Sequence, residues 1–313
     1  MNLSVIIPVY NRAYCLHECV DSLINIKSRD FEIILVDDGS LDRSLEVCRN
    51  YEKEDSRIKT IHQENQGVSA ARNKGLKEAN GQYVMFVDSD DKIISETVEA
   101  FLEQKNNQDL YLFDYYIKGT ERVYQKRQLG DKDCIDDLYY FFLLGKNNMI
   151  WNNIYRNEII KEHAISFRTD MKMGEDYAFN VEYMTYVESF EYCNRALYVY
   201  TEDSEGSAMN SCKIKYIEDY IILFDFTLPY YKEKKYQSLL NLDYYLNCIF
   251  KNLFLAEYKE DDGILDLFEK STIHEYLIRH KYNNLKTDLK KNILKYHLYR
   301  KRMIRNLIKK IFY

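Results

Sequence analysis

The first hundred residues alternate between short apolar runs and longer amphipathic stretches. Four of the apolar runs are rich in β-branched residues, which is typical of buried strands. These runs are residues 3–7, 32–36, 58–62 and 83–87. Apolar positions recur at helical spacing over residues 13–26, 43–54 and 68–79. The resulting β-α-β-α-β-α-β order predicts a mostly parallel sheet with helices packed against it.

The pattern is less regular after Asp91. It predicts helices near residues 95–106, 136–144, 158–162 and 176–188. It also predicts strands near residues 110–116, 190–193 and 197–200, with polar loops before residue 133. From about Lys213 onward the periodicity is helical, tyrosines are frequent, and Gly and Pro are almost absent. We therefore expect a helical C-terminal region.

The composition is that of an ordinary globular protein, with 46% hydrophobic and 30% charged residues in a chain of 313. The formal net charge is -6, but residues 279–313 carry twelve Lys and Arg against one acid, a charge of +11. The remainder therefore carries -17, that is, -6 minus 11. This distribution argues against a nucleic-acid-binding body and places any attraction to anionic surfaces in the tail.

Seven cysteines occur without any C-x-x-C pair, which fits neither a disulfide framework nor a zinc module. We expect reduced thiols and hence a cytoplasmic protein. The chain begins without a basic segment followed by a long apolar one, and it contains no run of eighteen apolar residues. The sequence therefore predicts neither a signal peptide nor a membrane-spanning helix.

Asp37 and Asp38 directly follow the second predicted strand and precede Gly39 and Ser40. One interpretation is a turn followed by a helix cap, because these residue types favour such loops. The alternative is a binding site in which a fixed carboxylate accepts hydrogen bonds from a base N–H or a ribose hydroxyl. Open α/β sheets bind ligands at this carboxyl edge.

Three acids, Asp88, Asp90 and Asp91, follow the apolar strand at residues 83–87. Like charges packed at a sheet edge repel one another, so a divalent cation or several hydrogen-bond donors must compensate them. Carboxylates in a loop suit Mg²⁺ or Mn²⁺, which can neutralise charge on a diphosphate leaving group. The structural alternative is a helix cap.

The third predicted helix opens with Gly67 and Ser69 and carries Arg72 one turn in. Backbone N–H groups at a helix start and an arginine fork both suit phosphate. An arginine on the surface of an ordinary helix is the alternative. Neither a G-x-G-x-x-G nor a P-loop motif is present, which argues against dinucleotide oxidoreductases and P-loop enzymes.

Taken together, residues 5–11, 36–40, 65–73 and 87–91 resemble glycosyltransferase family 2 in order and spacing. The resemblance covers roughly the first hundred residues and implies an inverting, metal-dependent enzyme with the GT-A fold. It further implies a catalytic domain over residues 1–212. Within it, residues 1–100 would bind the nucleotide sugar and residues 101–212 would face the acceptor, followed by the helical region 213–313.

The same resemblance assigns roles to individual residues. The implied donor-binding residues are Pro8, Tyr10, Asp38, Arg72, Asp88 and Ser89. Tyr10 would lie beside the base, Asp38 would bind the uracil edge, and Arg72 would approach the base or the diphosphate. Asp90, with Asp88, would coordinate Mn²⁺ or Mg²⁺. Asp91 would either share the metal or cap the next helix.

On the acceptor side, Glu175 and Asp176 resemble the acid pair that supplies the family's general base. We assign the base to Asp176, with Glu175 as the alternative; both acids could instead simply stabilise a helix start through its dipole. Trp151 lies in a segment that resembles the acceptor-side wall of surface-polysaccharide enzymes, although a core position fits a tryptophan equally well. Residues 198–207 depart from that branch, because acids occupy the place of its arginine.

The resemblance predicts transfer of a sugar, with inversion, from a UDP-sugar to a saccharide or lipid-linked acceptor in capsule or exopolysaccharide synthesis. Residues 300–313 form a basic amphipathic pattern, which predicts contact with the inner face of the cell membrane or packing on the protein itself. Two other classes remain open: a non-catalytic nucleotide-sugar-binding protein and a membrane-peripheral scaffold. The intact acids argue against the first, and the scaffold leaves them unexplained.

Overall fold

The computed structural model describes most of the first two hundred residues and one further helix. The described residues are 1–104, 107–120, 123–124, 134–135, 138, 142, 148–202 and 217–231. The chain divides into two compact units, the first comprising Met1–Thr169 with Glu175–Ala208 and the second Asp170–Gly174 with Met209–Tyr313. The domain division at residue 212 stays a prediction.

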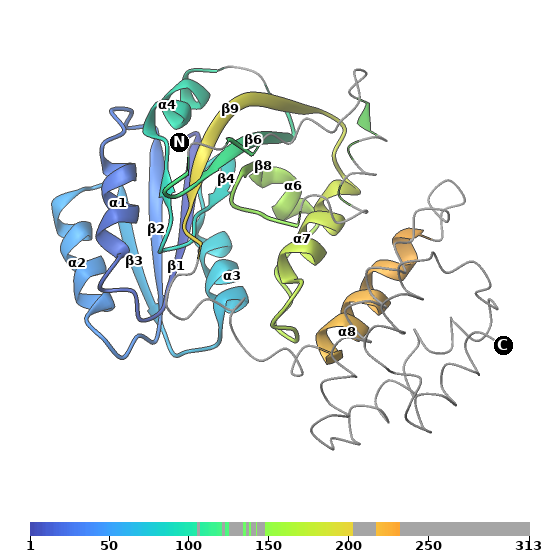
Figure 1. Cartoon of the computed structure of the whole chain (residues 1–313), viewed down its shortest axis with the longest axis horizontal. Helices are drawn as coiled ribbons and strands as arrows, with labels where there is room; N and C mark the ends of the chain where they lie inside the picture. The colour runs from blue at the N-terminus through green and yellow to red at the C-terminus, as the bar shows by residue number, and fades with distance from the viewer. Residues whose placement is uncertain are drawn as a thin grey trace. The chain divides into compact units, whose positions relative to one another are not determined.

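The first part of unit 1 contains the four strands and three helices predicted from periodicity (Figure 1). The strands are β1 (Leu3–Val9), β2 (Phe31–Asp38), β3 (Ile58–Gln63) and β4 (Tyr83–Phe86). The helices are α1 (Leu16–Ile24), α2 (Ser44–Glu54) and α3 (Val68–Glu78). β1 pairs in parallel with β2 and β4, and β2 pairs in parallel with β3. Right-handed crossovers therefore place α1 and α2 on one face of the sheet and α3 on the other.

The second part of unit 1 extends this sheet with strands of both directions. Its elements are β5 (Lys92–Ile93), α4 (Ser95–Glu103), β6 (Leu110–Ile117), β7 (Val123–Tyr124), β8 (Asn153–Arg156), α6 (Asn157–Glu162), α7 (Glu175–Met184) and β9 (Phe190–Tyr200). Within the described residues the strand order is β3-β2-β1-β4-β8-β6-β9-β5, and β7 pairs with β6. β8 is antiparallel to both β4 and β6, so the sheet is mixed beyond its four parallel strands.

Three differences from the predicted elements have physical causes. β8 was not predicted, because a four-residue strand beginning with a buried asparagine has no recognisable apolar alternation. β9 is one strand, where two were predicted. The apolar alternation of β9 is interrupted at the exposed pair Asn194 and Arg195. At this point the pairing register with β6 shifts, between Phe113 and Asp114. The helix predicted near residues 136–144 falls largely outside the described residues.

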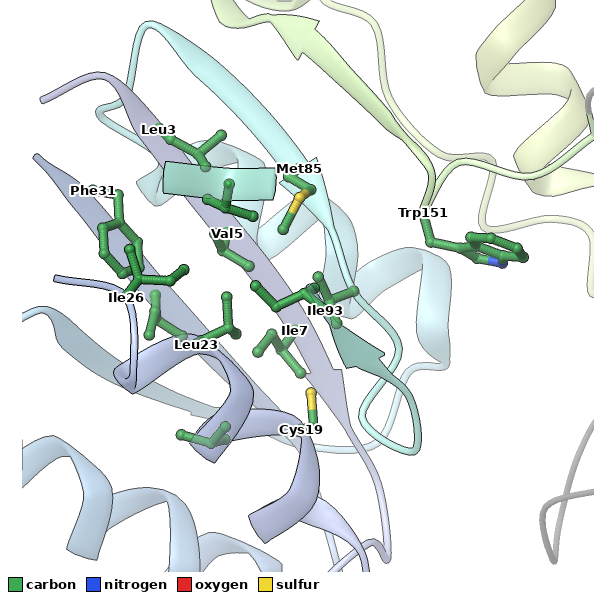
Figure 2. Close-up of a cluster of buried hydrophobic side chains, with 14 of the residues drawn as sticks. Leu3, Val5, Ile7, Cys19, Leu23, Ile26, Phe31, Met85, Ile93 and Trp151 are labelled. Atoms are coloured by element: carbon green, nitrogen blue, oxygen red, sulfur yellow. The ribbon is translucent and has the colours of Figure 1, made fainter. Parts of the chain in front are cut away.

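The main hydrophobic core lies between the sheet and α1 (Figure 2). Alternate residues of β1, including Leu3, Val5 and Ile7, are fully buried against Cys19 and Leu23 of α1. Burying each large aliphatic side chain contributes about 1.5–3 kcal/mol, so this face fixes the position of β1 and of the loop that follows it.

On the opposite face, α3 packs closely on β1 because Gly75 has no side chain. A Cβ atom at Gly75 would lie 2.4 Å from Cγ2 of Ile6, which is closer than carbon atoms approach in proteins. The small residue therefore lets α3 lie directly on the sheet. This packing also fixes Arg72, one turn earlier on the same helix.

The second unit is described at residues 170–174 and at α8 (Ile217–Thr227) with the short 3-10 helix Leu228–Tyr231. Gly174 has a φ of +86°, and a Cβ there would lie 2.7 Å from a methyl carbon of Leu223. Among the described residues, no helix combines the length and apolar character needed to cross a membrane. The basic segment 300–313 lies outside the described residues.

Candidate active site

The loops that follow β1 and β2 are joined by hydrogen bonds from backbone N–H groups to side chains. Asn11 donates its N–H to Oγ of Ser40 at 3.0 Å, and its own Oδ1 accepts the N–H of Leu41 at 2.7 Å. Arg12 donates its N–H to Oγ of Ser44 at 2.7 Å. These contacts hold the carboxyl ends of two parallel strands as one frame, at the edge where such sheets bind ligands.

Asp38 uses its carboxylate to shape the loop before α3. Its Oδ1 accepts hydrogen bonds from Gln63 and from the N–H of Gln66, and its Oδ2 accepts the N–H of Gly67 at 2.8 Å. Gly67 has a φ of +90°, a conformation that glycine adopts without strain. Asp38 is only 3% exposed, and its hydrogen bonds to the N–H groups of Gln66 and Gly67 fix the start of α3.

Asp37 is fully buried beside this frame. His62 contacts its Oδ2 at 2.7 Å, and Oδ1 is a buried oxygen that finds no hydrogen-bond partner among the described residues. Tyr10 is 41% exposed and Pro8 is partly buried, both at the carboxyl end of β1. The ring of Tyr10 is therefore accessible at the place where the resemblance puts the donor base.

Asp91 does not cap the next helix, α4, whose N-cap residue is Ile94; the other role considered from the sequence, sharing the metal, stays a prediction. Its carboxylate accepts hydrogen bonds from the hydroxyl of Tyr198 at 2.9 Å and from the N–H of Thr201 at 2.6 Å. It is 1% exposed, and burial, followed by the charge of Asp88, raises its pKa to about 8. Asp91 therefore anchors the acid loop, residues 88–91, to the end of β9.

Tyr198 is a site residue that the sequence analysis missed. Its hydroxyl donates to Asp91 and accepts the N–H of Asp88 at 2.9 Å, so one buried phenol holds both ends of the acid loop. Its ring stacks on Trp151 with centroids 4.4 Å apart. No local pattern could indicate this contact, because Tyr198 lies more than a hundred residues after the acids it binds.

Arg72 connects the acid loop to the acid pair at the start of α7. Its Nη2 donates to Oδ1 of Asp88 at 3.0 Å, and its Nη1 donates to Oδ1 of Asp176 at 2.8 Å and lies 3.5 Å from Oε1 of Glu175. The guanidinium lies over the ring of Phe167 at 5.3 Å. Burial alone would lower the pKa of Arg72, but the three acids hold it above its ordinary value. Arg72 therefore remains charged and joins two clusters that are far apart in the sequence.

Glu175 and Asp176 occupy the first turn of α7, so the helix dipole contributes to their stability, as the structural alternative supposed. Burial raises the pKa of Asp176 above its ordinary value, and the negative charges of Glu175 and Asp88 act in the same direction. Arg72 opposes this shift through its ion pair. A carboxyl group balanced in this way suits general-base chemistry near neutral pH.

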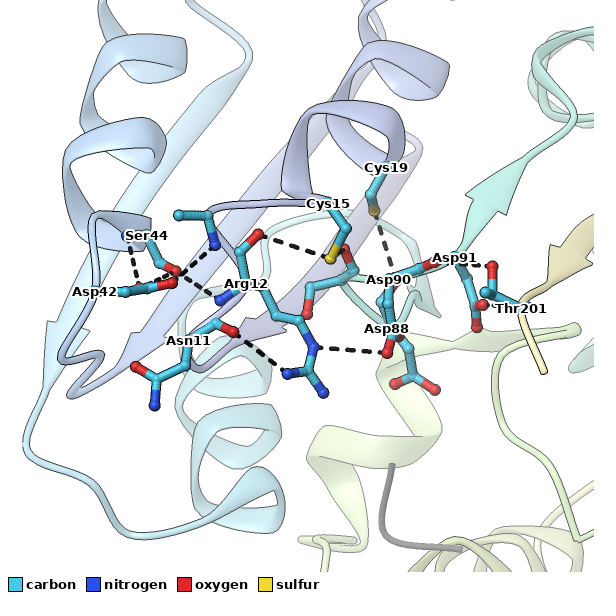
Figure 3. Close-up of polar contacts among 12 residues, drawn as sticks. Asn11, Arg12, Cys15, Cys19, Asp42, Ser44, Asp88, Asp90, Asp91 and Thr201 are labelled. Atoms are coloured by element: carbon cyan, nitrogen blue, oxygen red, sulfur yellow. Dashed lines mark hydrogen bonds and ion pairs between the residues drawn. The ribbon is translucent and has the colours of Figure 1, made fainter. Parts of the chain in front are cut away.

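Asp90 lies on the other side of the acid loop and faces a second arginine (Figure 3). Nε of Arg12 is 3.5 Å from Oδ2 of Asp90, and the backbone carbonyl of Asp90 accepts a hydrogen bond from the hydroxyl of Thr201. Each of the three acids is thus compensated, Asp88 by Arg72, Asp90 by Arg12 and Asp91 by hydrogen-bond donors. Hydrogen-bond donors, one of the two kinds of compensation predicted from the sequence, are thus present together with two arginine side chains.

Among the residues described, no cluster of three or more His, Cys, Asp or Glu side chains is arranged to hold a metal ion. Asp88 and Asp90 nevertheless fit a metal that arrives with a diphosphate. Mg²⁺ in nucleotide sites is usually held by one or two carboxylates, with phosphate oxygens and water as the remaining ligands. The residues present therefore match a shared metal site rather than a cage made by protein alone.

The two remaining predicted residues are buried. Trp151 is 5% exposed, and its indole stacks on Tyr198 and, at 5.4 Å, on Tyr200. This is the core position considered as the alternative for Trp151, and it leaves little of the indole for an acceptor sugar. Ser89 is 6% exposed, and its carbonyl lies 3.8 Å from Sγ of Cys15.

A mixed α/β sheet that carries an acid loop, an arginine-bearing helix and a second acid pair at its carboxyl edge defines a GT-A fold, as predicted. The chain belongs to glycosyl transferase family 2, whose model matches residues 4–168. This membership confirms the resemblance found in the sequence.

Individual relatives agree with this assignment. The uncharacterized glycosyltransferase EpsJ of Bacillus subtilis is 33% identical over 210 residues, which cover 64% of this chain and 61% of EpsJ. The match thus spans less than two thirds of that relative. Among solved structures, S. aureus TarS 1–349 in complex with UDP-GlcNAc has a TM-score of 0.63 at 21% identity, covering 99% of this chain and 82% of that one.

The mannosyltransferase PcManGT of Pyrobaculum calidifontis, in complex with GDP-Man and Mn²⁺, has a TM-score of 0.55 at 12% identity. This comparison covers 99% of this chain and 83% of that one. At these sequence identities, both structural neighbours support the fold alone.

Proposed function

We propose that the protein is a metal-dependent, inverting glycosyltransferase that moves a sugar from a UDP-sugar to a saccharide or lipid-linked acceptor in surface-glycan synthesis. The observation that carries the proposal is the position of Arg72 between Asp88 and Asp176. These acids come from a loop after β4 and from the start of α7, yet one guanidinium bonds to both. One guanidinium thus joins Asp88, which we propose as a donor-side acid, to Asp176, which we propose as the base.

In the proposed reaction Asp176 accepts the proton of the acceptor hydroxyl as that oxygen bonds to the anomeric carbon. The bond between this carbon and the diphosphate oxygen breaks, and the nucleoside diphosphate leaves with the bonding electrons. Arg72 bonds to Oδ1 of Asp176, so we assign the proton to Oδ2. Glu175 is the alternative base. Asp88 and Asp90 would hold Mn²⁺ or Mg²⁺, which would neutralise charge on the leaving group.

The donor would lie across the carboxyl ends of β1 and β2. We place the base beside the accessible ring of Tyr10 and near Pro8, and we retain Asp38 and Ser89 as donor-side residues. UDP is the first choice of nucleotide because the TarS neighbour was solved with UDP-GlcNAc. GDP is the alternative to test, because PcManGT was solved with GDP-Man.

A thermal-shift panel of UDP, GDP, CDP and TDP, each with and without Mn²⁺, tests the donor class. A ligand that binds only the folded state raises the melting temperature by mass action. We expect UDP to raise the melting temperature only when Mn²⁺ is present. In a second assay, the protein should slowly release UDP from the matching UDP-sugar. If none of the nucleotides shifts the melting temperature, the scaffold class is favoured, whereas a shift without any turnover favours the non-catalytic nucleotide-sugar-binding class.

The acceptor side of the proposal includes the tail. The basic amphipathic sequence of residues 300–313 supports contact with an anionic membrane at the cytoplasmic face, where a lipid-linked acceptor would be presented. Co-sedimentation with vesicles containing phosphatidylglycerol tests this by comparing the full chain with a chain that ends at residue 299. Equal binding by both would remove the tail from the proposal.

A further inference from the structure

Arg12 is an arginine at the acid loop to which neither the sequence analysis nor the resemblance assigns a role. It follows β1 directly, and its guanidinium extends to Asp90 with Nε 3.5 Å from Oδ2 (Figure 3). Its Nη1 donates to the carbonyl of Asn11 at 3.3 Å. Its side chain is 19% exposed and that of Asp90 is 17% exposed, so the pair lies at the border between protein and solvent.

The backbone of Arg12 is held on both sides, so its side chain starts from a fixed point. Its N–H bonds to Oγ of Ser44, and its carbonyl accepts the N–H groups of Cys15 and Leu16 at 3.1 Å and 2.9 Å. The side chain itself is held more weakly. A separation of 3.5 Å is an ion pair but too long for a strong hydrogen bond, so the guanidinium can change partner at small cost.

Arg72 differs from Arg12 in its burial and in the number of acids that its guanidinium already binds. Its side chain is 5% exposed, both of its terminal nitrogens already bond to acids, and its Nε is buried without a partner within the described part of the chain. Recruiting Arg72 to phosphate would leave Asp176 or Asp88 without its cation in a buried site, which is costly. The diphosphate therefore requires a different cation from the one that the resemblance suggests.

We propose that Arg12 is a diphosphate-binding residue of the donor site, held on Asp90 in the ligand-free protein and transferred to the diphosphate when Asp90 binds a divalent cation. The planar guanidinium matches phosphate oxygens in a bidentate manner. While it rests on Asp90, it also competes with a cation for that carboxylate. This inference rests on the proposed function, because it assigns a residue to the same donor site.

The inference predicts opposite effects on two binding constants. Removing the charge with Arg12→Gln should weaken UDP binding at saturating Mn²⁺ by about tenfold to a hundredfold, as expected for a lost charge-assisted contact. The same variant should bind Mn²⁺ alone about two- to fivefold more tightly, because a competing ion pair at the border between protein and solvent has been removed. UMP, which lacks the second phosphate, should lose less affinity than UDP.

Calorimetry with UDP and UMP, and paramagnetic resonance of free Mn²⁺, measure these constants without relying on turnover. Arg43→Gln is the matched control, because Arg43 is an exposed arginine that pairs with Glu46 at the start of α2. Arg12→Lys keeps the charge but loses the fork and should fall between the wild type and Arg12→Gln. Circular dichroism and the melting temperature show whether each variant is folded.

Three outcomes separate this inference from the proposed function. Weaker UDP binding together with tighter Mn²⁺ binding in Arg12→Gln, but not in Arg43→Gln, supports the inference. UDP binding by Arg12→Gln that equals that of Arg43→Gln overturns it, even though the wild type binds UDP. If the wild type binds no nucleotide with any metal, the proposed function itself fails. Should Arg12→Gln not fold, Arg12→Lys decides by the same comparison of UDP with UMP.

Discussion

The two halves of the sheet in unit 1 contribute to the site in different ways. The parallel half, β1 to β4, builds its ligand edge from neighbouring loops, as in the contacts of Asn11 with Ser40 and of Arg12 with Ser44. The mixed half, containing β8, β6, β9 and β5, contributes side chains and one backbone N–H group that bond to the acid loop or to Arg72. Tyr198 and Thr201 of this half bind Asp91, and Asp176 binds Arg72.

Under the proposed function, this difference separates donor binding from chemistry. A frame made by the parallel half alone can present Tyr10 and the acid loop to a nucleotide. The candidate base and the anchors of the acid loop, in contrast, come from the mixed half and reach the site only when the whole sheet is formed. Substitutions in the parallel half should therefore alter donor affinity, and those in the mixed half should alter turnover or the stability of the acid loop.

Asp176→Asn should produce the largest effect and separates the halves most directly. The amide keeps the size of the side chain but cannot accept a proton, so transfer should slow by about 10²- to 10⁴-fold. Affinity for UDP with Mn²⁺, which depends on the parallel half, should change by less than about twofold. Steady-state kinetics and calorimetry on the same preparation measure both quantities.

Glu175→Gln is the matched control for this experiment. It removes the neighbouring charge from the same helical turn, and transfer should fall much less. A large loss in Glu175→Gln with little loss in Asp176→Asn would exchange the roles of the two acids. Equal turnover in both variants and the wild type would remove the acid pair from the mechanism.

Asp90→Asn should give the next largest effect, this time on binding. Losing one of the two carboxylates proposed to hold the metal should weaken Mn²⁺-dependent UDP binding by about a hundredfold. Glu64→Gln removes an exposed acid from the loop after β3 and serves as the control for net charge. UDP affinity in Asp90→Asn that matches Glu64→Gln would exclude Asp90 as a metal ligand.

The same division explains how much the sequence could predict. The four parallel strands and their helices follow from local apolar periodicity, which needs no knowledge of distant residues. The acids at 88, 90 and 91 were recognisable because they follow a strand that is apolar throughout. Their individual roles were not, since Asp91 is bonded by Tyr198 and Thr201, which lie about 110 residues further along the chain.

Two further misses have the same origin. β8 is too short to show a period, and its position between β4 and β6 depends on pairing across the sheet. Arg12 directly follows the motif at residues 5–11, in which Pro8 and Tyr10 were given roles, and its proximity to Asp90 depends on how two loops fold. Isolated charges carry no local signal of their partners, so ion pairs between distant loops are seen only in the structure.

Tyr198→Phe tests the anchor that the mixed half provides. The variant keeps the ring stacked on Trp151 but removes the hydroxyl that bonds to Asp91 and to the N–H of Asp88. Leaving buried polar groups unsatisfied should lower the free energy of unfolding by about 1–3 kcal/mol. Urea denaturation measures this loss. Tyr200→Phe, whose ring stacks on the same indole, is the control, and an equal loss in both would show that the hydrogen bonds to Asp91 and Asp88 are not responsible.

The smallest effect is expected from an ion pair that joins the two halves at the surface. Glu18 of α1 lies in the parallel half. It contacts Nζ of Lys92 at 2.8 Å and Nζ of Lys118 at 3.0 Å, and both lysines lie in the mixed half. Hydrogen bonds to Lys92 and then to Lys118 lower the pKa of Glu18 to about 2. Because the side chain is 52% exposed, Glu18→Gln should cost only about 0.5 kcal/mol of unfolding free energy at neutral pH.

The pH dependence of this difference follows from the direction of the pKa shift. A carboxyl group whose pKa is lower in the folded state than in the unfolded chain, where it is about 4.3, stabilises the fold above that value. The contribution disappears as the pH falls from about 4 toward 2. The gap in denaturant midpoint between wild type and Glu18→Gln should therefore be constant from pH 6 to 8 and narrow at pH 3. It should also shrink in 1 M NaCl, because salt screens exposed charges. A difference in denaturant midpoint that persists under both conditions would mean that the aliphatic part of the Glu18 side chain, and not its charge, joins the halves.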